Sequence, residues 1–354
     1  MTALPSNTAL ASNTLPRAGL PKTVAVTAPR PQKRTHKETA LARVPVWMWR
    51  AIMHRILPGE LHKFNAEPID TVDYTFDIDY DGDGLREHRL DVLVPHDADR
   101  PLPVYIYFHG GGWTSGDKAP LTKYAASQAA DGMIVVNANY RMATRFQLKH
   151  MLEDGNAVLD WVAQNIADFG GDPARIVLGG DSAGGHIAAL LAASAYEPEL
   201  AAYYGIEPHV APENLRGLVQ HCSIADFSVM FERGFVLSLN FLKMLLPERG
   251  RGLALRAAAR FMSPIEWLDS GFPPVFVTTS ERDYFYRANL NFIAALRRRS
   301  IQVDTLIYDR KRANTHHTWQ QDAKHPESQE VYRQLGAFVR KVAPARPLMA
   351  AAQA

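Results

Sequence analysis

A serine set between glycines is the residue of this chain best suited to covalent chemistry. Ser182 lies in the run Gly180-Asp181-Ser182-Ala183-Gly184, after the apolar segment 176–178 and before the alanine-rich segment 187–195. A serine in a tight turn between a strand and a helix exposes its hydroxyl for nucleophilic attack. Glycines two positions away on either side relieve the crowding of such a turn. The pattern therefore predicts a buried strand, a strained turn with a nucleophile, and a helix.

A second glycine-rich segment has the composition of an anion-binding loop. The run His109-Gly110-Gly111-Gly112-Trp113 follows the alternating, aromatic segment 104–108, which predicts a central strand. Attack on an ester carbonyl places a negative charge on its oxygen. Backbone N–H groups fixed in advance stabilise that charge, each by roughly 3 kcal/mol. Three glycines let the main chain approach the oxygen, so the run predicts an oxyanion hole.

A nucleophilic serine also needs a base and a group that orients the base. After a strand–turn–helix serine, the acid precedes the histidine in the chain. Segment 274–279 predicts a strand that ends near Glu281 and Asp283, so either carboxylate is a candidate acid. Segment 303–308 predicts a further strand, and the loop after it holds the candidate bases His316 and His317.

These motifs resemble those of the hormone-sensitive-lipase-like branch of the α/β-hydrolases, a family of serine carboxylesterases. The resemblance covers most of residues 70–342, and its two glycine-rich motifs are specific to the family. It implies an α/β-hydrolase fold, with a mostly parallel central sheet, helices on both faces and a helical cap. It implies no cofactor. The matching stretches are 109–113, 139–143, 169–186, 263–264, 273–283 and 315–319.

The resemblance also implies a role for particular residues. Ser182 matches the nucleophile, and the Gly/Ser-Glu-x-Asp run of the family places the acid at Asp283. The family usually has His-Gly-Phe in the last loop, and His317-Thr318-Trp319 fits that spacing. We therefore expect His317 to be the base in preference to His316.

The oxyanion donors of the family fall on the backbone amides of Gly111, Gly112 and Ala183. Two positions depart from the family pattern. Trp113 stands where phenylalanine is common, and His186 stands where asparagine is common. We expect Trp113 to contact substrate, and both departures leave the substrate preference open.

Charge and composition exclude several classes of partner. The 354 residues carry 39 basic and 37 acidic side chains, a net charge of +2, which gives no indication of nucleic-acid binding. The single cysteine, Cys222, is expected to be a small buried residue. Because one cysteine cannot form an internal disulfide, the chain does not need an oxidising compartment, and we expect a cytoplasmic location.

No metal site is expected, because adjacent His316 and His317 point their rings apart. Run 79–84 imitates the start of a calcium loop, but Leu90 stands at the twelfth position, which favours a hairpin turn.

The sequence predicts one catalytic domain with two covering segments. We expect a disordered tail at 1–40, a cap-helix region at 41–70, the catalytic domain at 71–345 with a cap insertion at about 225–262, and a disordered tail at 346–354. Segment 41–57 is amphipathic, which suits either a helix over the active-site mouth or a helix lying on lipid. No stretch is long enough for stable membrane insertion, so lipid contact would be peripheral.

Together these features predict a serine carboxylic-ester hydrolase, an esterase or lipase that forms an acyl-enzyme with a small-molecule ester. A formamidase, deacetylase or lactonase with the same triad is the alternative. A non-catalytic ligand receptor on this scaffold is a further alternative, which the retained histidines disfavour. The sequence leaves the oligomeric state open between a monomer and a homodimer.

Overall fold

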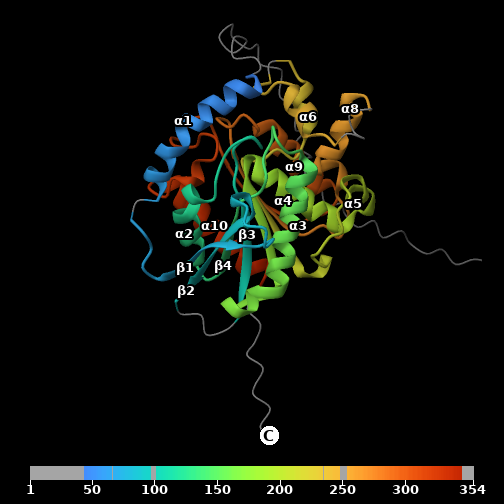
Figure 1. Cartoon of the computed structure of the whole chain (residues 1–354). Coiled ribbons are helices and arrows are strands. Elements are labelled where there is room, and N and C mark those ends of the chain that lie inside the picture. Colours follow the sequence, from blue (N-terminus) through green and yellow to red (C-terminus); the bar gives the residue numbers. More distant parts are fainter. Residues whose placement is uncertain (1–43, 66, 97–100, 234, 248–252, 345–354) are drawn as a thin grey trace, which may run out of the picture.

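The centre of the structure is a sheet with the strand order β1-β2-β4-β3-β5-β6-β7-β8 (Figure 1). The computed structural model describes residues 44–65, 67–96, 101–233, 235–247 and 253–344, so the tails expected at 1–40 and 346–354 lie outside the described residues. The strands are β1 Val72–Asp79, β2 Arg89–Pro95, β3 Leu102–Phe108, β4 Ile134–Ala138, β5 Gly171–Asp181, β6 Leu215–His221, β7 Val275–Ser280 and β8 Val303–Tyr308.

Most strand pairs in this sheet are parallel, as the sequence predicts. From β4 through β8 the neighbouring strands are parallel, whereas β2 is antiparallel to both β1 and β4. The strand predicted at 218–224 is displaced, since β6 ends at His221. It ends there because Cys222 has a φ of 47°, which turns the chain out of the strand.

Helices cover both faces of the sheet, and the alternation of side chains along β3 shows the division. Val104, Ile106 and Phe108 pack in the core beneath α3, α4 and α9, whereas Tyr105 and Tyr107 pack beneath α2 and α10 (Figure 1). This two-residue period is what a sheet buried on both sides requires. The helices are α2 Thr122–Ala129, α3 Leu148–Asn165, α4 Ser182–Tyr196, α5 Pro198–Tyr204, α6 Asn240–Leu245, α8 Leu255–Ala258, α9 Tyr286–Arg298 and α10 Pro326–Val342.

A further helix, α1 Val46–Phe64, lies at the same end of the molecule as α6 and α8 (Figure 1). It starts and ends several residues later than the amphipathic segment 41–57. The Val44 amide donates a hydrogen bond of 2.7 Å to the Val236 carbonyl, which joins the start of α1 to the insertion at 225–262. Within the described ranges, no helix combines the length and the apolar character needed to cross a bilayer.

The turn between β5 and α4 is held by a close approach of main chain to main chain. Ser182 has a φ of 50°, a left-handed conformation that costs a non-glycine residue of order 1–3 kcal/mol. A Cβ on Gly184 would lie 2.0 Å from the Phe108 carbonyl oxygen, and one on Gly180 would lie 2.5 Å from the same atom. Only glycine therefore lets the end of β3 support this turn.

Gly184→Ala is expected to destabilise the fold by about 3 kcal/mol or more, because the clashing atom is backbone and has little room to move. Gly59→Ala is the matched control, since nothing lies within 4 Å of a Cβ there and alanine is favoured in a helix interior by about 1 kcal/mol. Urea unfolding measures both variants. Equal stability of the two variants would contradict this account of the turn.

Candidate active site

The loops after β7 and β8 bring the expected acid and base into contact. Nδ1 of His317 lies 2.7 Å from Oδ1 of Asp283. The Asp283 carboxylate also accepts hydrogen bonds from the Thr279 hydroxyl at 2.9 Å and from the Phe285 amide at 3.1 Å. These donors fix the carboxylate, which in turn fixes the ring of His317. Because Nδ1 is engaged, Nε2 is the nitrogen left to exchange a proton.

The rival candidates lie elsewhere. Glu281 accepts a hydrogen bond of 2.9 Å from the Arg310 amide at the surface. His316 is exposed, and neither residue lines the pocket that Ser182 and His317 share. The structure therefore brings together Asp283 and His317, and it separates Glu281 and His316 from them.

The expected oxyanion donors come from two segments: Gly111 lines the same pocket as Ser182, and Ala183 follows the serine in the chain. Gly111 and Gly112 have φ values of 126° and 62°, so the loop after β3 needs glycine at both positions. No side chain caps the first turn of α4, which leaves the Ala183 amide among the unpaired donors of a helix start. The indole of Trp49 donates to the Gly111 carbonyl at 3.3 Å, which holds this loop from the side of α1.

Asp181 connects the loops that surround Ser182. Its carboxylate accepts hydrogen bonds from the Tyr107 hydroxyl at 2.7 Å, the Gly110 amide at 3.1 Å and the Gln321 side chain at 3.0 Å. Burial raises the pKa of Asp181 to about 6. The residue thus joins the oxyanion loop to the loop that follows His317, and it does so with a carboxylate that is costly to ionise.

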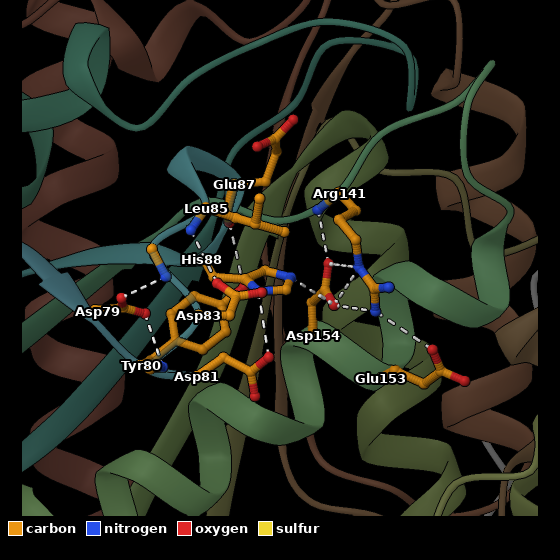
Figure 2. Close-up of polar contacts among 12 residues, drawn as sticks. Asp79, Tyr80, Asp81, Asp83, Leu85, Glu87, His88, Arg141, Glu153 and Asp154 are labelled. Atoms are coloured by element: carbon orange, nitrogen blue, oxygen red, sulfur yellow. Dashed lines mark hydrogen bonds and ion pairs between the residues drawn. The ribbon is translucent and has the colours of Figure 1, made fainter.

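A network of buried ion pairs fixes the segment behind the oxyanion loop (Figure 2). The Tyr140 hydroxyl donates to the His109 carbonyl at 2.7 Å. Next to it, the amide and guanidinium of Arg141 donate to the Asp154 carboxylate, which also lies 3.3 Å from Nε2 of His88. The Asp154 carboxylate raises the pKa of His88, whose Nδ1 faces Asp83 at 2.9 Å. The hairpin between β1 and β2 thereby supports the active-site loops through α3.

Trp113 and His186, the two departures from the family pattern, form a pair in the core. Nε1 of Trp113 donates to Nδ1 of His186 at 3.1 Å, and Nε2 of His186 is 2.7 Å from the Met262 carbonyl. Burial lowers the pKa of His186 to about 3, so the ring is neutral and its two nitrogens have one role each. Trp113 is 1% exposed and does not line the pocket. The expected contact of Trp113 with substrate is therefore replaced by a supporting role, because its ring points into the core.

A pocket of about 250 Å³ lies over Ser182, between the loops and α1. The inner face of α1 lines it, whereas no described residue of the insertion at 225–262 does. The outward Trp47 is 71% exposed, and contact of this helix with lipid stays a prediction. The lining residues are Trp49, Ile52, Met53, Ile56, Leu57, Glu60, His109, Gly110, Gly111, Gly116, Asp117, Pro120, Leu121, Asp181, Ser182, Tyr284, His317, Thr318 and Gln321.

Sequence reasoning missed four members of this lining, namely Trp49, Glu60, Tyr284 and Gln321. Tyr284 packs on His317 with ring centroids 4.2 Å apart, directly after the acid in the chain. Trp49 and Glu60 lie on one face of α1. Their spacing in the sequence, at a helical period, could have predicted that they share this face. Gln321 follows the histidine loop and has no motif that could have identified it.

Two groups of described residues place metal-ligating atoms within 4.8 Å of one another: Cys222 with Asp283 and His317, and Asp81 with Asp83 and His88. In both groups a ring nitrogen of histidine is already paired with a carboxylate. Burial raises the pKa of the Cys222 thiol well above its usual value, which disfavours the thiolate that a metal would need. The geometry of both groups is that of hydrogen-bonded pairs.

Two solved structures have a similar fold. Esterase B from Lactobacillus rhamnosis has a TM-score of 0.73 at 21% identity, with 87% of this chain and 97% of that chain covered. A bacterial heroin esterase has a TM-score of 0.66 at 20% identity, with 87% and 96% covered. These likenesses show an α/β-hydrolase fold.

The family follows from the sequence. The family model described as BD-FAE matches residues 90–289, and the chain belongs to that family. Esterase LipQ of Mycobacterium tuberculosis is 32% identical over 244 residues, which are 64% of this chain and 51% of LipQ. Carboxylesterase NlhH of the same organism is 40% identical over 111 residues, 31% of this chain and 35% of NlhH. The chain thus spans about half or less of the length of these relatives.

The Trp113–His186 pair should show energetic coupling. Trp113→Phe leaves Nδ1 of His186 buried without its donor, which costs about 1–3 kcal/mol. Combining it with His186→Asn removes the orphaned nitrogen, so the double variant should lose at least about 1 kcal/mol less than the sum of the single variants. Urea unfolding of the four proteins measures the coupling, and additive losses would contradict the pairing.

Asp181→Asn should change the pH dependence of stability. A raised pKa means that the folded state holds the proton more tightly than the unfolded chain. The wild type therefore loses stability relative to Asp181→Asn as the pH rises from about 4 to about 7, by up to about 3 kcal/mol. Unfolding free energies across this range test it, with the exposed Asp70→Asn as control. A constant difference between wild type and Asp181→Asn would refute it.

Proposed function

We propose that this protein is a serine carboxylic-ester hydrolase that acts through an acyl-enzyme intermediate. The observation that carries the proposal is the His317–Asp283 pair, joined at 2.7 Å, in the same pocket as a serine held at a φ of 50°. The esterase names of LipQ and NlhH agree with it. No step of this chemistry calls for a cofactor.

The proposed reaction has two steps. His317 accepts the proton of Ser182 as the serine oxygen attacks the ester carbonyl, and it then donates that proton to the leaving alcohol. The amides of Gly111, Gly112 and Ala183 stabilise the oxyanion. A water molecule, deprotonated by the same imidazole, releases the acid and regenerates the serine. Asp283 orients the ring and stabilises its charged form throughout.

The pocket favours a small, partly apolar ester. Its apolar lining comes mainly from α1 together with Pro120 and Leu121, and about 250 Å³ accommodates a small molecule. Formamides, acetylated amines and lactones present a similar carbonyl and remain the alternative substrates of the same triad. The proposal includes a cytoplasmic enzyme, supported by the buried and unpaired Cys222. A homodimer stays a prediction.

Kinetics of variants on p-nitrophenyl acetate test the catalytic roles. Ser182→Ala and His317→Ala should each lower kcat by about 10⁴-fold or more, because each removes the function of the whole unit. His316→Ala is the matched control and should stay within a few-fold of wild type, since its side chain is exposed outside the pocket. Asp283→Asn should lose activity where Glu281→Gln does not.

Far-UV circular dichroism and the unfolding midpoint establish that the variants fold. Wild-type activity in folded Ser182→Ala would overturn the proposed function. A large loss in His316→Ala with none in His317→Ala would overturn the choice of base and leave the serine in place.

A further inference from the structure

One charged side chain belongs to the otherwise apolar inner face of α1. Glu60 lines the active-site pocket on the same helix as Trp49, Met53 and Ile56, at spacings that place all four on one face. It is half-buried. Burying a carboxylate among apolar side chains destabilises the folded protein. The presence of Glu60 at this position therefore indicates a role other than stability.

The Glu60 carboxylate is not held by a direct contact within the described part of the chain. Among the residues that the structure describes, no hydrogen bond or ion pair reaches its carboxylate. The nearby cation, Lys63, is 2.7 Å from Asp322. Burial raises the pKa of Glu60, the charge of Asp181 adds to the effect, and the charge of Lys63 opposes it in part. A cation brought into the pocket would stabilise this carboxylate.

The other charged side chains that line the pocket are also acidic. Asp117 and Asp181 also line it, whereas within the described part of the chain neither a lysine nor an arginine does. Asp117 is paired with Arg86 at 2.9 Å, and Asp181 is held by buried donors. Glu60 is thus the carboxylate left to interact with a ligand, in a pocket whose potential attracts cations and repels anions.

The position of Glu60 indicates which part of the ester it faces. The Tyr284 ring lies 4.2 Å from the ring of His317 and is 42% exposed, and the charge of Glu60 acts on its hydroxyl. Because His317 must reach the leaving oxygen to protonate it, this side of the pocket holds the alcohol. Tyr284 and Glu60 line the same pocket, and an aromatic ring together with a carboxylate is a combination that binds ammonium groups.

We propose that the pocket selects esters whose alcohol moiety carries a positively charged ammonium group, and that Glu60 is the residue that determines this specificity. The inference rests on the proposed ester hydrolysis and deepens it by naming a substrate class. Glu60 takes no part in bond making or breaking; it positions the cationic end of the alcohol while the ester carbonyl lies at Ser182.

Two esters that differ in one atom test the proposal: acetylthiocholine and its uncharged carbon isostere, 3,3-dimethylbutyl thioacetate. They share the acyl group, and their leaving thiols have the same shape but differ in charge and in acidity. The difference in acidity is the same for every variant, so a change in the ratio of their kcat/KM values between variants reports the interaction with the charge. Wild type should prefer the cation by about fivefold or more. Glu60→Gln should lower the ratio by about fivefold or more relative to wild type through a higher KM for acetylthiocholine, and Glu60→Lys should lower it further. Asp70→Asn removes the same charge from the surface and should keep the wild-type ratio.

The outcomes separate this inference from the proposed function. Equal use of both esters by wild type, or an unchanged ratio in Glu60→Gln, would overturn the specificity and leave ester hydrolysis intact. Hydrolysis of either ester by folded Ser182→Ala at the wild-type rate would instead overturn the proposed function. Calorimetric binding of acetylthiocholine to Ser182→Ala, with and without Glu60→Gln, measures the charge preference in the absence of turnover. Equal affinities there would also contradict the proposal.

Discussion

The contact of the Gly180–Gly184 turn with the end of β3 is the constraint on which the rest of the site depends. The turn holds Ser182 in a left-handed conformation, and the Phe108 carbonyl leaves no space for a side chain at either glycine. Because β3 continues into the oxyanion loop, the same contact sets the distance between the serine and the amides after Phe108. The strain at Ser182 and the close approach at the two glycines thus fit the proposed role of this turn, in which the serine hydroxyl is held beside fixed N–H donors.

The parallel sheet positions the other residues that we propose to be catalytic. β7 and β8 end at the same edge as β5, so the loops after them meet above Ser182 and bring Asp283 to His317. Buried polar groups then stiffen the loops from behind: Asp181 connects two of them, and the Arg141–Asp154 pair fixes a third (Figure 2). Preorganised dipoles of this kind need no rearrangement when charge develops in the transition state.

Much of this could be predicted from the sequence, because strand periodicity and turn glycines are local signals. The segments at 104–108, 176–178 and 303–308 fall within strands of the sheet, and 274–279 overlaps β7 in all but its first residue. What could not be predicted depends on contacts between distant segments. Trp113 follows the oxyanion glycines, yet its ring turns into the core toward His186, 73 residues away. Either residue read alone suggests a change in substrate preference, whereas together they are a compensated pair.

Local sequence patterns also could not predict which segment covers the pocket. The sequence predicts two covering segments, the cap-helix region at 41–70 and the insertion at about 225–262, and it cannot say which one faces the serine. The structure places α1 over the pocket, and its one inward carboxylate, Glu60, becomes notable only once the surrounding apolar residues are seen. Glu60 stands out because, among the described residues, no lysine or arginine lines the pocket with it, and a sequence does not show which residues line a pocket.

Reaction with a fluorophosphonate, followed by intact-mass and peptide-mapping mass spectrometry, tests the central claim most directly. The reagent phosphonylates a serine only where a base and an oxyanion hole activate it. The account predicts a single adduct on Ser182, formed far more slowly in His317→Ala. An unmodified Ser182, or labelling that is equally fast without the imidazole, would contradict it.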